Sequence, residues 1–348
     1  MSKRSIIHAM DSKEIVYRAL DFEAVPRVPY AVDFTVPARE KLCASTAGRR
    51  LYDRIVNDLL LTPVIRVEWG FYDAEGLYED EFGLVWDRSL DPDIGIPRSF
   101  VTPENLNTIP WPDPRREGRF DLLRDNIRRY PDRFQVMSLD FSLYERSWGL
   151  RGLENMYMDM IEQPDFTEIL LDRVLDFNLK IIEAGLEACP EIDAVHFGDD
   201  FGGQTGIPMG AERWRRLLKP RLARQYGAAK DAGKIVSIHS CGKVEEILDD
   251  LVEIGVDLFN PFQPEVTDVP SVFRRYHGRL AFWGGVSTQK LLPYASVKEV
   301  EEQIDRLLEM GSNGGYVIAP AHATPGDARV ENMEAMLLRI LDQPGQRR

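Results

Sequence analysis

The sequence predicts one (β/α)8 barrel of the triosephosphate isomerase type, an α/β fold that forms a single domain over residues 1–348. Three observations predict it. Strand-like and helix-like segments alternate regularly from about residue 190 onwards, which favours parallel strands joined by crossover helices. Strand-like segments in the first half bring the total to the eight that close such a barrel. The 348 residues, 44% of them hydrophobic, are enough for one large core.

The first half of the chain begins with a predicted N-terminal helical extension over residues 1–26. Apolar runs rich in β-formers then favour three strands, at 27–34, 63–69 and 133–141. Residues 77–88 are predicted to form a hairpin insertion with Gly83 at or near its turn. Residues 151–188 have helical spacing and are predicted to form two helices that break near Pro164.

The second half contains the other five strand-like segments, which are short apolar runs. They are residues 193–198, 234–239, 256–260, 279–285 and 315–320. Helices are predicted at 211–233, 243–255, 296–311 and 329–343. Ser296 is the expected N-cap of the third of these helices. An open, doubly wound sheet is the alternative topology, but no glycine-rich phosphate turn follows the first strand to favour it.

Charge and apolar pattern narrow the classes of partner. The chain has 43 Lys and Arg against 57 Asp and Glu, a formal net charge of −14. Because no basic stripe is present to neutralise phosphates, nucleic acid and anionic membranes are not expected partners. No apolar stretch resembles a secretion signal or reaches the ~20 residues that span a bilayer. Together with only three scattered cysteines, this predicts a reduced, cytoplasmic protein.

The C-terminal ends of the predicted strands are where a barrel of this type carries its active site. Nearly all of these positions hold a polar residue or a glycine. They are Asp33, Glu68, Asp140, Asp199, Asp200, His239, Cys241, Asn260, Gln263, Gly284, Gly285 and His322. Such residues can ligate a metal, move a proton or approach a substrate, although loops are polar in any protein.

His239 and Cys241 stand two positions apart at the end of a predicted strand. Residues so spaced on an extended chain face the same way, so an imidazole and a thiolate can enter one coordination sphere, and this pair favours Zn²⁺. A catalytic zinc usually takes three protein ligands, and His322 after the last strand is the expected third. Asp199, Asp200 or Glu68 could replace His322 as the third ligand or complete the ligand set. The alternative is a packed histidine beside a small buried cysteine.

Asp199 and Asp200 are followed by two glycines and Gln204. Such a loop suits a polar ligand, with one aspartate free to bind metal or move a proton. A helix cap or turn network is an equally good interpretation of the two aspartates. Gly284 and Gly285 follow another strand and would allow a ligand to approach bare backbone, but a tight turn also explains them.

Four segments together resemble the uroporphyrinogen decarboxylase superfamily: "GDDFGGQTG", "SIHSCGKVEEILDDLVEIGVDLFNPFQPE", "LAFWGGVSTQKLLPYAS" and "GGYVIAPAHATP". The similarity extends in order over almost the whole chain. It implies a (β/α)8 barrel and one of two chemistries. These are decarboxylation of uroporphyrinogen without a cofactor, and zinc-dependent methyl transfer to or from corrinoid proteins.

The motifs are closer to the methyltransferase branch. The arginine-bearing glycine motif of true decarboxylases has no match in "VPYAVDFTVPARE", and their aspartate after the second strand has none in "VIRVEWGFYD". The His-x-Cys-Gly motif of the methyltransferases is matched by His239, Cys241 and Gly242. Their third zinc ligand is a cysteine where this chain has His322. Imidazole is an ordinary zinc donor, so His322 is expected to replace that cysteine. Because true decarboxylases carry a histidine at about this place, a decarboxylase-like site without metal is the alternative for His322.

The resemblance therefore implies a zinc-dependent methyltransferase. It would move a methyl group between a small donor, such as an O-methyl compound, or a thiol acceptor and a separate corrinoid (cobalamin) protein. His239, Cys241 and His322 would hold zinc, and Asp199, Asp200 or His322 would act catalytically. The expected substrate-binding residues are Glu68, Asp140, Gln204, Asn260, Gln263, Gly284 and Gly285.

Two other functions stay open. One is a carboxy-lyase acting on a tetrapyrrole or a smaller carboxylate, with His322 and Asp199 as acid and base. The other is a non-catalytic binder of a corrinoid or tetrapyrrole. A homodimer would fit the resemblance, although no interface pattern in the sequence demands it.

Overall fold

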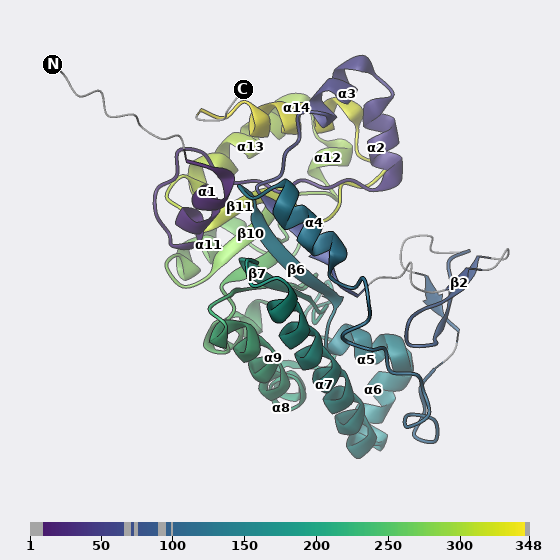
Figure 1. Ribbon diagram of the computed structural model, residues 1–348. Helices are drawn as coiled ribbons and strands as arrows, with labels where there is room; N and C mark the ends of the chain where they lie inside the picture. Colours follow the sequence, from purple (N-terminus) through teal and green to yellow (C-terminus); the bar gives the residue numbers. More distant parts are fainter. Residues whose placement is uncertain (1–9, 66–70, 73–75, 90–94, 99, 345–348) are drawn as a thin grey trace. The chain divides into compact units, whose positions relative to one another are not determined.

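The computed structural model describes residues 10–65, 71–72, 76–89, 95–98 and 100–344 (Figure 1). Its main sheet has seven strands in the order β1-β6-β7-β8-β9-β10-β11. Their bounds are β1 (Leu59–Pro63), β6 (Phe134–Phe141), β7 (Ala194–Gly198), β8 (Ile235–His239), β9 (Leu258–Phe262), β10 (Ala281–Val286) and β11 (Tyr316–Pro320). Tyr30 and Phe34 form parallel bridges beyond β11, to Ile318 and Thr324. This α/β architecture with parallel strands confirms the predicted (β/α)8-type fold.

The chain divides into two compact units. The first takes the described residues of 1–60, 129–134 and 257–348, and the second takes those of 61–128 and 135–256. Among the described residues, no helix combines the length and apolarity needed to cross a membrane.

The first unit contains the parallel strands β9, β10 and β11. Its helices are α1 (Ser12–Leu20), α2 (Val36–Cys43), α3 (Thr46–Tyr52), α11 (Val269–Tyr276), α12 (Leu291–Tyr294), α13 (Val297–Gly311) and α14 (Val330–Leu341). The helix α1 lies within the predicted N-terminal extension, and the Asp11 carboxylate caps it by accepting from Glu14 N at 2.8 Å. Ser296 caps α13 in a capping box with Glu299, as the sequence predicts.

The second unit contains the parallel strands β6, β7 and β8. Its helices are α4 (Asp121–Arg129, whose last residue falls in the first unit), α5 (Tyr144–Arg151), α6 (Leu153–Glu162), α7 (Pro164–Ala188), α8 (Ala211–Leu217), α9 (Lys219–Asp231), the 3₁₀ turn η2 (Glu245–Ile247) and α10 (Leu248–Glu253). α7 begins at Pro164, which confirms the predicted break, and it packs beside α9 (Figure 1). The predicted helix 211–233 is instead two helices, because Pro220 occupies the first turn of α9.

The hairpin insertion also belongs to the second unit and is confirmed. β3 (Leu77–Glu79) pairs antiparallel with β4 (Val85–Asp87), and Gly83 between them has a φ of 74°. β2 (Phe71–Tyr72) and β5 (Ile96–Pro97) extend the hairpin to a four-stranded sheet. Gly83 therefore supplies the left-handed conformation that the turn requires.

Two predicted strands are wrong in detail. The strand expected at 63–69 is observed as β1, at Leu59–Pro63, and residues 66–70 lie outside the described residues. Proline lacks the N–H that continues a ladder, so Pro63 is suited to the end of the strand. The strand expected at 27–34 makes only two isolated bridges, at Tyr30 and Phe34. The apolar pattern located both segments, whereas backbone pairing decides where a strand begins and ends.

Candidate metal centre

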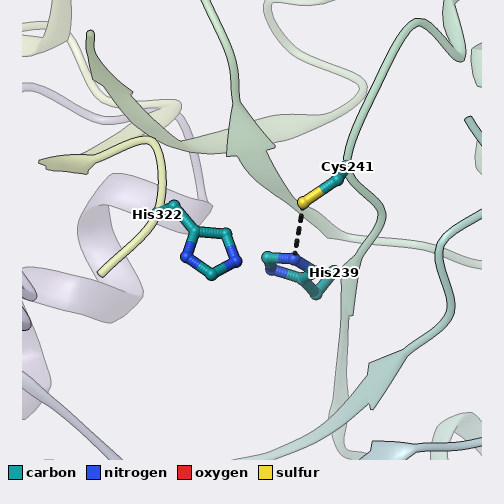
Figure 2. Close-up of side chains that lie close together, drawn as sticks. All are labelled: His239, Cys241 and His322. Atoms are coloured by element: carbon teal, nitrogen blue, oxygen red, sulfur yellow. Dashed lines mark hydrogen bonds between the residues drawn. The ribbon is translucent and has the colours of Figure 1, made fainter. Parts of the chain in front are cut away.

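The end of β8 brings an imidazole and a thiol together in the second unit. β8 pairs in parallel with β7, and His239 is in register with Gly198. His239 Nε2 lies 3.1 Å from Cys241 Sγ, and the dashed line in Figure 2 marks this contact. Both residues are half-buried. His239, at the end of β8, and Cys241, in the turn that follows, thus lie side by side as predicted.

The turn that carries Cys241 is shaped by close approach of two backbones. Gly242 has a φ of 81°, and a Cβ placed on it would lie 2.6 Å from the carbonyl carbon of Gly202. Lys243 N also donates to Gly203 O at 2.8 Å. Any side chain at Gly242 would separate these loops and strain the turn. Gly202 and Gly203, which follow β7, therefore allow the close approach of the turn that carries Cys241.

Asp200 is the carboxylate that contacts the pair. Its Oδ1 accepts from Cys241 N at 2.6 Å and lies 3.8 Å from His239 Nε2. Its side chain is 37% exposed, so one face remains open to solvent. Asp200 can therefore orient Cys241, and it is near enough to the pair to serve a bound metal or hold a proton.

Asp199, its neighbour in sequence, is fully buried and has a different environment. Its Oδ2 accepts from Ser142 Oγ at 2.5 Å and Leu143 N at 3.0 Å, and its Oδ1 accepts from Glu145 N at 2.9 Å. Burial raises the pKa of Asp199 to about 6, although these hydrogen bonds favour the charged form. The carboxylate holds the start of α5, which matches the cap network considered from the sequence.

The electrostatics of the site favour a cation. Burial raises the pKa of the Cys241 thiol, and the carboxylates of Asp200 and Glu145 raise it further. Burial together with Asp200 and Asp199 also raises the pKa of Glu145 well above its usual range. A thiolate is therefore unfavourable here unless a positive charge neutralises it. An imidazole and a thiol in acidic surroundings are a donor set that fits zinc.

Asp140, one of the predicted substrate-binding residues, is held in an unusual conformation at the end of β6. Its φ is +24°, and the register of β6 with β7 shifts between Ser138 and Phe141. Its Oδ1 accepts from Ser138 Oγ at 2.6 Å. Although Asp140 is exposed, the protein packed around its carboxylate raises its pKa, while the hydrogen bond from Ser138 and the charges of Arg146 and His239 act to lower it. A strained, non-glycine residue near His239 is the kind of feature that active sites retain.

Of the two other predicted substrate-binding residues in this part of the chain, Gln204 and Glu68, only Gln204 is described by the structure. Gln204 is exposed in the bend after β7. Glu68 lies outside the described residues.

In the first unit, the predicted substrate-binding residues lie at the ends of β9 and β10. Asn260 and Gln263 are each 8% exposed, and Asn260 Nδ2 donates to Trp283 O at 3.0 Å. Gly284 and Gly285 both have positive φ, and a Cβ on Gly285 would lie 2.2 Å from Tyr316 Oη. The space beside the two glycines is therefore occupied by the protein's own residues. This agrees with the tight-turn interpretation of the motif.

His322 follows β11 in the first unit. Ala321 N donates to Val286 O at 2.8 Å, so the chain leaves β11 still paired with the end of β10. His322 itself is exposed. It is the third side chain drawn in Figure 2.

Sequence reasoning missed Glu145 and Arg146. Both are buried in α5, with 7% and 8% exposure. No motif in their segment, "YERSWGLR", distinguishes these two charged residues. Only the packing of α5 against the loop after β7 shows that they belong near the site.

Comparison with known proteins agrees with the fold. The family model described as uroporphyrinogen decarboxylase (URO-D) matches residues 95–340. No curated protein matches the sequence. Among solved structures, a methyltransferase from Methanosarcina mazei is similar, with a TM-score of 0.71 and 16% sequence identity, covering 95% of this chain and 98% of that one. At this identity the likeness is one of fold. Because the family model spans well over half of the sequence, the chain belongs to the uroporphyrinogen decarboxylase family.

Proposed function

We propose that this protein is a zinc-dependent methyltransferase that moves a methyl group between a small methyl donor, or a thiol acceptor, and a separate corrinoid protein. The observation that carries the proposal is the 3.1 Å contact of His239 Nε2 with Cys241 Sγ at the end of a parallel strand. That is where barrel enzymes place their catalytic groups. The solved structure of similar fold is described as a methyltransferase, which favours methyl transfer as the reaction class.

His239 and Cys241 would be two zinc ligands, and we propose His322 as the third. Each of the three offers one ligand atom, an imidazole nitrogen or a sulfur. Three protein ligands leave a position for the substrate, as catalytic zinc sites require. Bound zinc would supply Lewis-acid activation of the donor's heteroatom, or the thiolate form of an acceptor thiol.

Asp200 would position the site and hold a proton. Its hydrogen bond to Cys241 N fixes the turn on which the sulfur sits. Its exposed face is available to a proton that the reaction releases or consumes. The corrinoid partner is proposed from the His239-x-Cys241-Gly242 motif, which is similar to that of the corrinoid-linked branch. A homodimer and a cytoplasmic location stay predictions.

The test is the metal content of protein purified without an affinity tag, measured by plasma mass spectrometry. We expect about one zinc per chain in the wild type. Cys241→Ser should lose the metal and His322→Ala should hold it more weakly. Cys43→Ser and His277→Ala are matched controls that should keep it, since neither residue belongs to the proposed ligand set. Protein that holds no zinc and takes none up would contradict the proposal and favour the carboxy-lyase alternative, which needs no metal.

Activity is tested separately, with free cob(I)alamin as methyl acceptor and aryl methyl ethers as donors. Formation of methylcobalamin, followed by its absorbance, should depend on added zinc and on Cys241. Zinc binding without methyl transfer to or from any cobalamin would contradict the corrinoid part of the proposal alone.

A further inference from the structure

A cavity of about 460 Å³ lies in the first unit beside the C-terminal ends of β9 and β10. Its walls come from the loop after β9, the loop after β10, α12 and the first half of α13. None of the three proposed metal ligands is among the residues that line it. The volume is within the range of sites that bind small organic molecules, roughly 300–1,000 Å³.

Glu265, in the loop after β9, gives this cavity a carboxylate oxygen that is not used by the protein. Its Oε1 accepts from Ser287 Oγ at 2.5 Å and from Gln289 N at 3.2 Å. Its Oε2 is buried and has no hydrogen-bond partner among the described residues. A buried carboxylate oxygen without a donor is costly, so this position suits a ligand that brings N–H groups.

Lys290, directly before α12, is the only basic residue among those that line the cavity. Its Nζ makes no ion pair or hydrogen bond with any described residue. The other acidic residue of the lining, Glu299, is already engaged, because its Oε2 accepts from Ser296 N at 2.8 Å and Ser296 Oγ at 2.7 Å. Glu265 and Lys290 therefore leave one negative acceptor and one positive donor available to a ligand.

The backbone that carries these two residues is held by one hydrogen-bond network. Ser287 Oγ, which donates to Glu265, also accepts from Lys290 N at 3.0 Å. The end of α12 is fixed by the fully buried Asn332 of α14, whose Nδ2 donates to Ala295 O at 2.9 Å. The walls are therefore formed without a ligand, and a preformed site lowers the cost of binding.

Other parts of the lining are apolar. They include Pro264, Leu291, Ala295 and Tyr294. Tyr294 is 76% exposed, so its ring is accessible from solvent. Such walls match an apolar body, and an exposed tyrosine ring can stack on a flat one.

We propose that this cavity binds a small zwitterion, an α-amino acid with an aromatic side chain. The ammonium group donates to Glu265 Oε2, and the carboxylate pairs with Lys290, whose flexible stem lets its Nζ reach it. One ligand with both charges satisfies both residues, whereas an amine or an acid alone leaves one of them without a partner. The site differs in its residues from the proposed metal centre, and the inference does not depend on the proposed function.

The test is calorimetric titration of the full chain with three probes that share one apolar body. They are L-phenylalanine, hydrocinnamate, which lacks the ammonium group, and phenethylamine, which lacks the carboxylate. The wild type should bind L-phenylalanine roughly 10- to 100-fold more tightly than either analogue, the range of a hydrogen bond to a charged group. Equal binding of the three probes, or no saturable binding of L-phenylalanine, would overturn the proposal and leave water as the partner of Glu265 Oε2.

Two substitutions separate the two charges. Glu265→Gln keeps an oxygen for Ser287, and it should weaken binding of L-phenylalanine and phenethylamine but not of hydrocinnamate. Lys290→Gln should weaken binding of L-phenylalanine and hydrocinnamate but not of phenethylamine. Lys298→Gln, which removes an exposed ammonium of α13 outside the cavity, is the matched control and should bind all three probes as the wild type does.

The selectivity of these losses decides the interpretation. Folded variants that lose all three probes equally, or that bind them as the wild type does, would show that charge recognition by Glu265 and Lys290 is not the cause and would overturn the proposal. The zinc content of each variant should equal that of the wild type, because neither residue belongs to the proposed ligand set. Zinc content therefore tests the proposed function separately from this site.

Discussion

The backbone N–H of Cys241 donates to Asp200 Oδ1 at 2.6 Å, which joins the loop after β8 to the loop after β7. The bond has two effects. It fixes the direction of the sulfur, and it places a negative charge beside a thiol whose pKa burial already raises. Both effects bear on how the site would hold a metal, and they can be separated by substitution.

Asp200→Asn should fold normally and bind zinc more weakly than the wild type. The asparagine oxygen can still accept from Cys241 N, but the charge that favours a cation is lost. We expect a loss of roughly 10- to 100-fold in zinc affinity, the usual cost of removing a supporting partner of a ligand. Competition with a chromophoric chelator measures it. Unchanged zinc affinity would show that Asp200 acts only through the hydrogen bond.

The Cys241 thiol should react slowly with alkylating reagents in metal-free protein. Its pKa is raised, so its reactive thiolate fraction should go on increasing with pH beyond about pH 10, where an ordinary thiol with a pKa of about 8.5 is almost fully ionised. The measurement is the iodoacetamide rate against pH in a Cys43→Ser background, since Cys189 is buried. Asp200→Asn in that background should shift the profile to lower pH. A wild-type rate profile with its midpoint near pH 8.5 would contradict the prediction.

Gly242→Ala should disrupt the metal centre and lower stability. The residue has a φ of 81°, and its new Cβ would lie 2.6 Å from the backbone of Gly202. We expect a loss of about 1–3 kcal/mol in the free energy of unfolding together with weaker zinc binding. Urea unfolding and chelator competition measure the two effects.

Gly227→Ala is the matched control for that change. Gly227 lies in α9, and its added Cβ would meet no atom within 4 Å. This variant should be equally or more stable than the wild type, by up to about 1 kcal/mol. If both alanine variants behaved alike, close packing at Gly242 would not be the cause.

His196 should make the protein sensitive to mild acid. It is buried within β7 with Nδ1 3.0 Å from Ser237 Oγ, and burial lowers its pKa to about 3. Between that value and the ordinary pKa of about 6.5, the unfolded chain binds a proton that the folded protein excludes. The free energy of unfolding therefore falls as pH decreases through this window, by at most about 1.4 kcal/mol per pH unit from this residue.

Urea unfolding of wild type and His196→Gln at several pH values between 7 and 4 tests this effect. The variant should show a weaker dependence on pH, whatever its absolute stability. Parallel curves for the two proteins would mean that His196 does not account for the acid sensitivity.

Local features of this protein could be predicted from its sequence because they depend on residues close together in the chain. The two-residue spacing of His239 and Cys241 on a strand end brings their side chains together without help from elsewhere. Pro164 begins α7 and Ser296 caps α13 for similarly local reasons. The alternation of strands and helices predicted the fold in the same way.

The tertiary structure alone decided what each charged residue near the site does. Asp199 and Asp200 are adjacent and chemically identical, yet α5 buries the first and leaves the second beside Cys241. Glu145 and Arg146 are charged residues that no sequence motif distinguishes, yet both are buried. The ends of β1 were likewise set by pairing with a distant strand. Burial and charged neighbours come from segments far apart in sequence, and the pattern of adjacent residues does not encode which segments those are.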